Sequence, residues 1–183
     1  MSDPVLTALL ATAGLQPPPT PRAIVEAVRA IPYGRTPAQD PHAVLEAGRG
    51  TCSTKHYLLA VALAELDPSV STTLVHRVYR LGRRRAGEIF GRAAAAAVPR
   101  RGLVDVHTYL VADIDGRRVP LDVTFPAGPA WDGRSPMPLW CGEGRDVLAG
   151  PNPDQTKREL VRRHCDPRHR EPFIAALTAA ADL

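Results

Sequence analysis

Residues 48–66 read GRGTCSTKHYLLAVALAEL, and the rest of the chain is organised around this stretch. It begins as a turn with two glycines and continues as an apolar helical pattern, with Thr51 placed to cap the helix and Cys52 in its first turn. Apolar residues cover most of the circumference, which predicts a largely buried helix. A cysteine in that first turn lies among unpaired backbone N–H groups at the positive end of the helix dipole, which favours the nucleophilic thiolate. The alternative is a small buried cysteine with a structural role.

The composition is that of a globular protein. A length of 183 residues suits one domain with a sizeable core, and the contents of 44% hydrophobic and 23% charged residues are ordinary. We predict a single domain over residues 1–183, with a catalytic core at about 22–126 and an irregular and helical extension at 127–183. The start at Met1 has no basic region and no apolar run is long enough to span a membrane, so we expect a cytoplasmic protein without a membrane partner. Three cysteines at irregular spacing argue against a disulfide framework.

The net charge of +4 comes mostly from arginine, with Lys55 and Lys157 as the only lysines. Arginines at 83–85 and 100–101 flank an alanine run at 93–97, and such a patch could bind nucleic acid. We favour a solvated loop and no nucleic-acid partner, and we expect residues 82–102 to form a long, weakly structured excursion whose role stays open.

Caps and apolar stripes predict the remaining elements. Threonine or aspartate followed by proline marks helix starts at Thr20 and Asp40, and glycine marks helix ends. A β-branched, apolar run predicts a strand at 72–81. Further helices are expected at 4–13, 154–164 and 171–181, and residues 126–153 are expected to be irregular because they are rich in proline and glycine. Together these elements predict an α+β fold.

Two strand-like runs, 103–114 and 117–125, are joined by Asp115-Gly116, which is a strong hairpin signal. A two-residue loop pairs residues whose numbers sum to 231 and gives the ribbon one apolar face.

This register brings two polar side chains close together on the other face of the ribbon. It places His107 opposite Thr124 and Asp122 opposite Tyr109. His107 and Asp122 are then diagonal neighbours, with Cβ atoms about 7 Å apart.

Cys52, His107 and Asp122 together are the set needed for thiol-based acyl transfer. The imidazole accepts the thiol proton, the thiolate attacks a carbonyl to form a thioester, and the carboxylate orients the ring. The helix N-terminus supplies the backbone N–H of Cys52 for the oxyanion. Tyr33, from the turn upstream, is a candidate for a second donor.

With these residues the chain resembles the transglutaminase-like superfamily of papain-like enzymes. The resemblance is carried by the Ile-Pro-Tyr33 segment with Val44-Leu45, by Gly50-Thr-Cys52 opening an apolar helix, and by His107 followed by Leu121-Asp-Val-Thr-Phe-Pro126. It implies a central cysteine-bearing helix packed on an antiparallel sheet, and amide or thioester chemistry without a metal or other cofactor. Arylamine N-acetyltransferases share the triad, but their fuller glycine-arginine motif before the cysteine is absent.

Several other residues compete for a role. His56, one helical turn from Cys52, is an alternative base, although no carboxylate is obviously placed to orient it. Asp105 could orient His107 in place of Asp122.

The remaining polar residues have weaker claims. Lys55 is expected at the surface or rim of the site. Tyr33, His76 and Tyr109 are candidates for substrate binding and Arg77 could line the same groove, although ordinary exposure is the simpler expectation for His76 and Arg77. The segment His164-Cys-Asp-Pro-Arg-His169 together with Cys141 fits no tetrahedral zinc pattern well, so we expect no metal site and a structural Cys165.

The sequence thus predicts a papain-like, transglutaminase-like cysteine enzyme, a hydrolase or an amine acyltransferase. Its substrate would be a small-molecule or peptide amide or thioester, with water or an amine as acceptor. Two hypotheses from other classes stay open: a catalytically inactive binding or scaffold module on the same fold, and an arginine-rich nucleic-acid binder.

Overall fold

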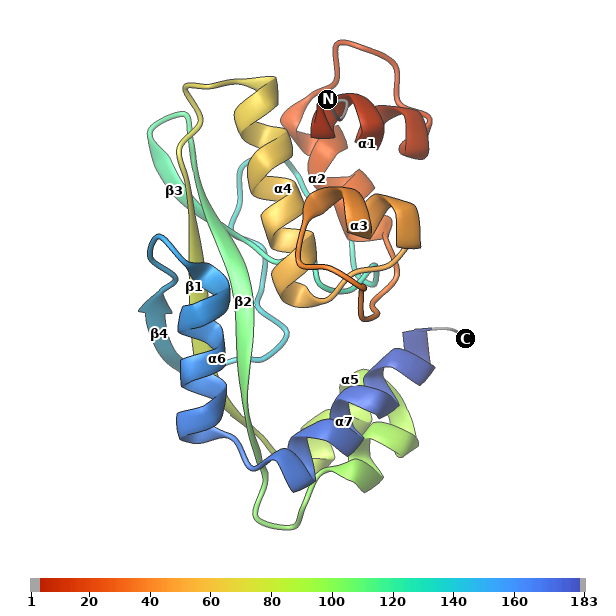
Figure 1. The fold of residues 1–183 in the computed structure, drawn as a ribbon, viewed down its shortest axis with the longest axis vertical. Helices are drawn as coiled ribbons and strands as arrows, with labels where there is room; N and C mark the ends of the chain where they lie inside the picture. The colour runs from red at the N-terminus through yellow and green to blue at the C-terminus, as the bar shows by residue number, and fades with distance from the viewer. Residues whose placement is uncertain (1–3, 182–183) are drawn as a thin grey trace. The chain divides into compact units, whose positions relative to one another are not determined.

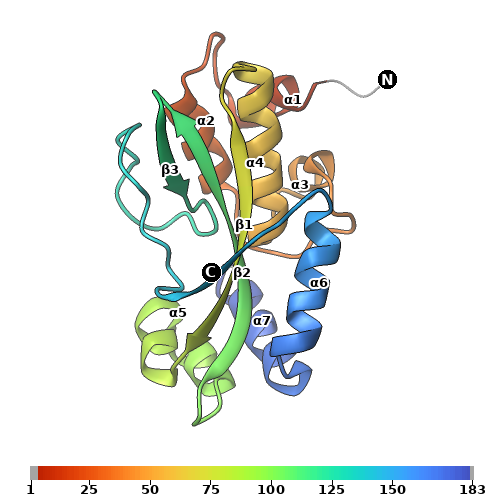
Figure 2. The same ribbon diagram turned by 90° about the vertical axis from the view of Figure 1, so that its left-hand side faces the viewer.

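Capping side chains start three of the first four helices, α2, α3 and α4, at the positions that the sequence predicts. In this computed structural model, which describes residues 4–181, Thr20, Asp40 and Thr51 each accept the backbone N–H three residues ahead. Residues 1–3, where we expected no secretion signal, lie outside the described range. The helices are α1 (Val5–Ala13), α2 (Pro21–Ala30), α3 (Pro41–Ala47) and α4 (Cys52–Leu66), and Figures 1 and 2 show the first three gathered beside α4.

The fold is α+β, with one four-stranded sheet in the described part of the chain. Its strands are β1 (Thr72–Leu81), β2 (Leu103–Ile114), β3 (Arg117–Leu121) and β4 (Gly144–Leu148), in the order β3-β2-β1-β4. The β2–β3 and β1–β4 pairs are antiparallel. The strand β4 corrects the expectation that residues 126–153 are wholly irregular.

The predicted hairpin register is confirmed for residues 110–114 and 117–121, whereas the predicted pairs His107–Thr124 and Tyr109–Asp122 lie beyond the paired residues. Pairs run from Ile114 with Arg117 to Leu110 with Leu121, so their numbers sum to 231 throughout. Asp115 and Gly116 have φ values of 53° and 72°, as a two-residue turn of the primed type requires.

The second strand of the hairpin is shorter than predicted. It ends at Leu121 instead of residue 125, because the next amides are used elsewhere. The N–H of Val123 donates to the His56 ring and the N–H of Thr124 donates to the Asp122 carboxylate. These two backbone N–H groups therefore do not pair with β2, because they bind side chains of the candidate site.

The chain forms two compact units. Unit 1 comprises Met1–Leu74 and Tyr109–Pro138, and unit 2 comprises Val75–Thr108 and Leu139–Leu183. The boundaries fall inside β1 and β2, so each of these strands contributes residues to both units. One domain over the whole chain stays a prediction.

The core of unit 1 is built around the cysteine helix. Buried side chains of α4 form one cluster with side chains of α1–α3 and of the β2–β3 hairpin, in line with a central helix packed on a sheet. The α4 members are Leu58, Leu59, Ala62 and Leu63, and the hairpin members are Leu110, Ala112, Val119 and Leu121.

The arginine- and alanine-rich segment of unit 2 is a helix, which corrects the loop expected at 82–102. Helix α5 (Arg83–Ala97) bends at Gly91, whose φ of 83° and ψ of −174° interrupt it. Alanine has the highest helix propensity, and this outweighs the flanking glycines. Ala86 and Ala94 are buried, and α5 packs on α7 (Pro167–Ala181), where Phe90 meets Phe173 edge-on.

The last two helices are close to prediction. Helix α6 (Pro153–His164) begins after Asn152, which caps it, and α7 begins four residues earlier than expected. Within residues 4–181, no helix is both long enough and apolar enough to cross a bilayer.

Candidate active site

Cys52 is the first residue of α4, behind a complete capping box. The Thr51 hydroxyl accepts the N–H of Thr54, and the Thr54 hydroxyl accepts the N–H of Thr51 at 2.9 Å. These bonds fix the entry of the chain into the helix. Cys52 is buried, with 9% of its surface exposed, among the N-terminal N–H groups of the helix.

Tyr33 lies beside the loop that leads into the cysteine. Its backbone forms a parallel bridge with Gly50, closed by bonds from the Gly50 N–H to Pro32 and from the Gly34 N–H to Gly50. The Tyr33 ring is buried and packs on Phe125 with the ring centroids 5.2 Å apart. A role of Tyr33 as oxyanion donor stays a prediction.

Asp122 follows β3 directly and is held by Thr124. One carboxylate oxygen, Oδ1, accepts both the Thr124 N–H at 3.2 Å and the Thr124 hydroxyl at 2.6 Å. Both residues are buried. The local chain therefore holds this carboxylate oxygen in place.

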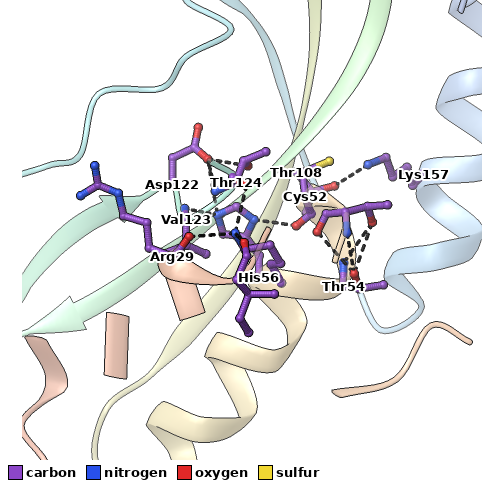
Figure 3. A network of polar contacts seen from close by, with 12 residues as sticks. Arg29, Cys52, Thr54, His56, Thr108, Asp122, Val123, Thr124 and Lys157 are labelled. Atoms are coloured by element: carbon purple, nitrogen blue, oxygen red, sulfur yellow. Dashed lines mark hydrogen bonds and ion pairs between the residues drawn. The ribbon is translucent and has the colours of Figure 1, made fainter. Parts of the chain in front are cut away.

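His56 is pinned in one tautomer by its backbone partners. Its Nε2 accepts the N–H of Val123 at 3.0 Å, so the ring proton must lie on Nδ1, which donates to the carbonyl oxygen of Cys52 at 2.6 Å. Figure 3 shows this ring between Val123 and Cys52.

A carboxylate does lie near His56, contrary to our expectation, since Asp122 Oδ1 is 3.7 Å from Nε2. A proton on Nε2 would, however, oppose the Val123 N–H, so the geometry selects the neutral imidazole. His56 is also completely buried. It is therefore built as a structural link between the cysteine helix and the segment after Asp122, and is poorly suited to be a base.

The position of Lys55 differs from the expected one. It was predicted at the surface or rim of the site, yet it is completely buried. Its Nζ donates to three backbone carbonyls, those of Arg29, Ile31 and Thr124. Burial lowers the pKa of Lys55 to about 7, and the nearby Asp122 carboxylate opposes this shift. Three oxygen partners made this burial possible, and they come from segments far apart in sequence.

His107 lies on the part of β2 that belongs to unit 2. It is buried, and its ring packs edge-on against Trp140 with the centroids 5.2 Å apart. Asp105, the alternative orienting residue, is engaged by Arg170, whose Nε lies 2.7 Å from Oδ1. This ion pair makes Asp105 a poor competitor of Asp122.

His76 is buried and not exposed, contrary to the simpler expectation. Its Nδ1 lies 3.0 Å from the Thr108 hydroxyl, and its Nε2 lies 3.0 Å from the carbonyl oxygen of Pro153. Burial, together with the positive charge of Lys157, lowers the pKa of His76 to about 4. Arg77 forms a two-pronged ion pair with Asp146. The substrate-binding roles of His76 and Tyr109 stay predictions.

The other two cysteines have different surroundings. Cys141 is buried in unit 2. Burial and the Asp105 carboxylate raise the pKa of Cys165 to about 11, which makes that thiol a poor nucleophile. Among residues 4–181, no group of three or more His, Cys, Asp and Glu side chains is arranged to hold a metal ion.

The predicted residues thus divide between the units. Cys52, Asp122, Tyr33 and Tyr109 lie in unit 1, where His56 links the cysteine helix to the Asp122 segment, while His107 and His76 lie in unit 2. That Cys52, His107 and Asp122 meet stays a prediction. The buried Lys55 and the linking His56 were missed by sequence reasoning.

Comparison with protein-family models and with curated proteins found no relative of this chain. No protein-family model matches the chain, and no curated protein matches it. The resemblance to the transglutaminase-like superfamily is therefore carried by the residues of this chain.

Proposed function

We propose that this protein is a cysteine-dependent acyl-transfer enzyme with a papain-like, transglutaminase-like architecture and a cytoplasmic location. Cys52 is the nucleophile, His107 the general acid and base, and Asp122 the residue that orients His107. The observation that carries the proposal is that Cys52 opens a buried, fully capped helix, in the same unit as a carboxylate that Thr124 holds in place.

The chemistry follows from these roles. His107 takes the proton of the Cys52 thiol, and the sulfur attacks the carbonyl carbon of an amide or thioester. The tetrahedral oxyanion accepts a hydrogen bond from the N–H of Cys52 at the helix start. The C–N or C–S bond then breaks, the imidazolium protonates the leaving group, and a thioester to Cys52 remains. Water or an amine, deprotonated by the imidazole, attacks this thioester to release an acid or a new amide.

Two features support His107 over the other buried histidines. The proton of His56 lies on Nδ1 and both of its nitrogens are bound to backbone groups. His76 is likewise held between Thr108 and Pro153, and its lowered pKa makes it a weak base.

Mass spectrometry of the intact protein tests the proposal. We expect a panel of small amides and thioesters to leave an acyl adduct on wild-type protein, and none on Cys52→Ala. His107→Ala should slow adduct formation by about 10²–10⁴-fold, the range for loss of a general base. Cys141→Ser is the matched control and should react like the wild type. An adduct that persists in Cys52→Ala would refute the assignment.

The burial of Cys52 favours a second candidate, a binding or scaffold module on the same fold. Iodoacetamide separates the two. For the enzyme, Cys52 is alkylated near neutral pH and His107→Ala suppresses the reaction. For the module, alkylation of Cys52 is slow and independent of His107. Peptide mapping identifies which of the three cysteines reacts.

A further inference from the structure

The least expected side chain of unit 1 is a lysine without exposed surface. Lys55 lies on α4, three residues after Cys52, and it is the first of the two lysines in the chain. A buried lysine is rare and needs a partner for each of its donors. Because Lys55 lies on the helix that carries the proposed nucleophile, it is a candidate for a role in the active site.

The partners of Lys55 suit the ammonium form. An ammonium group has three N–H donors, and Nζ faces three backbone carbonyl oxygens. A neutral amine has two N–H donors and a lone pair, and the lone pair would then point at an oxygen. Arg29 and Ile31, two of the partners, lie at the end of α2, so the lysine also ties that helix end to α4.

The third partner connects the lysine to Asp122. The carbonyl of Thr124 accepts from Lys55 at 3.1 Å, while the N–H and the hydroxyl of the same residue donate to Asp122 Oδ1. Thr124 is thus held on one side by the lysine and holds the carboxylate on the other. All of these contacts lie within unit 1.

We propose that Lys55 is a positioning residue of the active site: its ammonium group holds Thr124, and through Thr124 the Asp122 carboxylate, against the helix that carries Cys52. This inference rests on the proposed function. When protonated, the lysine also places a positive charge near Asp122 and Cys52 in a buried setting, where it favours the anionic forms of both.

The charged and titratable neighbours of Lys55 predict how its own protonation responds to substitution. Asp122 and Cys52 raise the pKa of Lys55, whereas Arg29 lowers it, as does burial. Asp122→Asn keeps an acceptor for Thr124 and removes only the charge. It should therefore move the titration of Lys55 to lower pH, and Arg29→Met should move it to higher pH.

NMR of protein labelled with ¹³C at lysine Cε measures this titration directly. The spectrum contains two lysine signals, and Lys157→Arg assigns them. We expect the Lys55 signal to titrate near pH 7 and to shift in opposite directions in Asp122→Asn and Arg29→Met. A Lys55 titration that does not respond to Asp122→Asn overturns the inference.

The pH profile of Cys52 alkylation tests the positioning role. In a Cys141→Ser, Cys165→Ser background, Lys55→Met should move the midpoint of the iodoacetamide profile to higher pH by about one unit, which lowers the rate near neutrality about tenfold. Arg22→Met removes an exposed cation of the same unit that does not act on Lys55, and should leave the midpoint in place.

The outcomes separate this inference from the proposed function. A purely structural lysine would lower the melting temperature of Lys55→Met without moving the alkylation midpoint, and that result overturns the positioning role. If no substrate leaves an adduct on wild-type Cys52, the proposed function fails, while the coupling of Lys55 to Asp122 is still decided by the lysine titration. Should Lys55→Met not fold, the Asp122→Asn and Arg29→Met titrations decide the inference.

Discussion

At the scale of single residues, Thr124 forms hydrogen bonds with two charged side chains, those of Asp122 and Lys55. Its hydroxyl donates to Asp122 Oδ1 at 2.6 Å and its carbonyl accepts from Lys55. Thr124→Val keeps the shape of the side chain and removes only the hydroxyl. We expect a loss of about 1–2 kcal/mol in the free energy of unfolding, because a buried carboxylate loses a hydrogen bond.

The same substitution should slow adduct formation on Cys52 about tenfold, since the carboxylate is no longer fixed. Urea unfolding and the acylation rate measure the two effects. Thr12→Val is the control, because the Thr12 hydroxyl donates to the Ala8 carbonyl within its own exposed helix turn. Equal effects of both variants on the acylation rate would contradict the role of Thr124.

Residue roles were predictable from sequence only where the partners are local. The cap at Thr51 and the position of Cys52 follow from a few neighbouring residues. Lys55 was misplaced because its three partners are backbone oxygens 24 to 69 residues away, and backbone oxygens leave no trace in a sequence pattern. The linking role of His56 was missed for the same reason, since its partner Val123 is 67 residues distant.

At the scale of elements, a disrupted start of α4 should lower the reactivity of Cys52. Thr51→Ala removes the side-chain acceptor of the capping box and should cost about 1 kcal/mol of stability. It should also slow alkylation of Cys52, because the first turn frays and the helix dipole at its start no longer favours the thiolate as strongly.

Thr20→Ala is the matched control, because Thr20 caps α2 in the same way. It should cost a similar amount of stability and leave the alkylation rate unchanged. Thermal unfolding and alkylation followed by peptide mass spectrometry measure both quantities. If the two variants slow alkylation equally, the effect comes from general destabilisation and not from the helix start.

Elements with strong local signals were predictable, and those that depend on packing were not. The register of the β2–β3 hairpin follows from Asp115-Gly116 and one apolar face. Helix α5 was missed because glycines at 82, 87 and 91 suggest a loop, while its burial against α7 is visible only in the fold. The end of β3 at Leu121 depends on His56 and Asp122 taking the next two amides.

At the scale of the whole molecule, His76 should make stability depend on acidity. Its pKa is lowered to about 4 in the folded protein by burial and by the positive charge of Lys157, while an unfolded histidine titrates near 6.5. The unfolded chain therefore binds more protons between these values, and stability present above pH 6.5 is lost as the pH falls towards 4.

By linkage, about 2 kcal/mol of this stability should be lost by pH 4.5. The free energy of unfolding in urea at pH 7.5, 5.5 and 4.5 measures the loss. His76→Gln should flatten the dependence, whereas His169→Gln, at an exposed position of α7, should not. An unchanged slope in His76→Gln would show that the acid sensitivity has another source.

The two units offer a last test, because each contains one of the two tryptophans. Trp131 lies in the core of unit 1 and Trp140 contacts His107 and Phe90 in unit 2. The variants Trp140→Phe and Trp131→Phe therefore give fluorescence from one unit at a time. We expect the two urea midpoints to coincide after correction for the stability of each variant, because β1 and β2 each contribute residues to both units and a small fold that shares strands in this way should unfold cooperatively. Two separate transitions would mean that the units unfold independently, so that a change such as Lys55→Met could disturb unit 1 while leaving His107 in a folded unit 2.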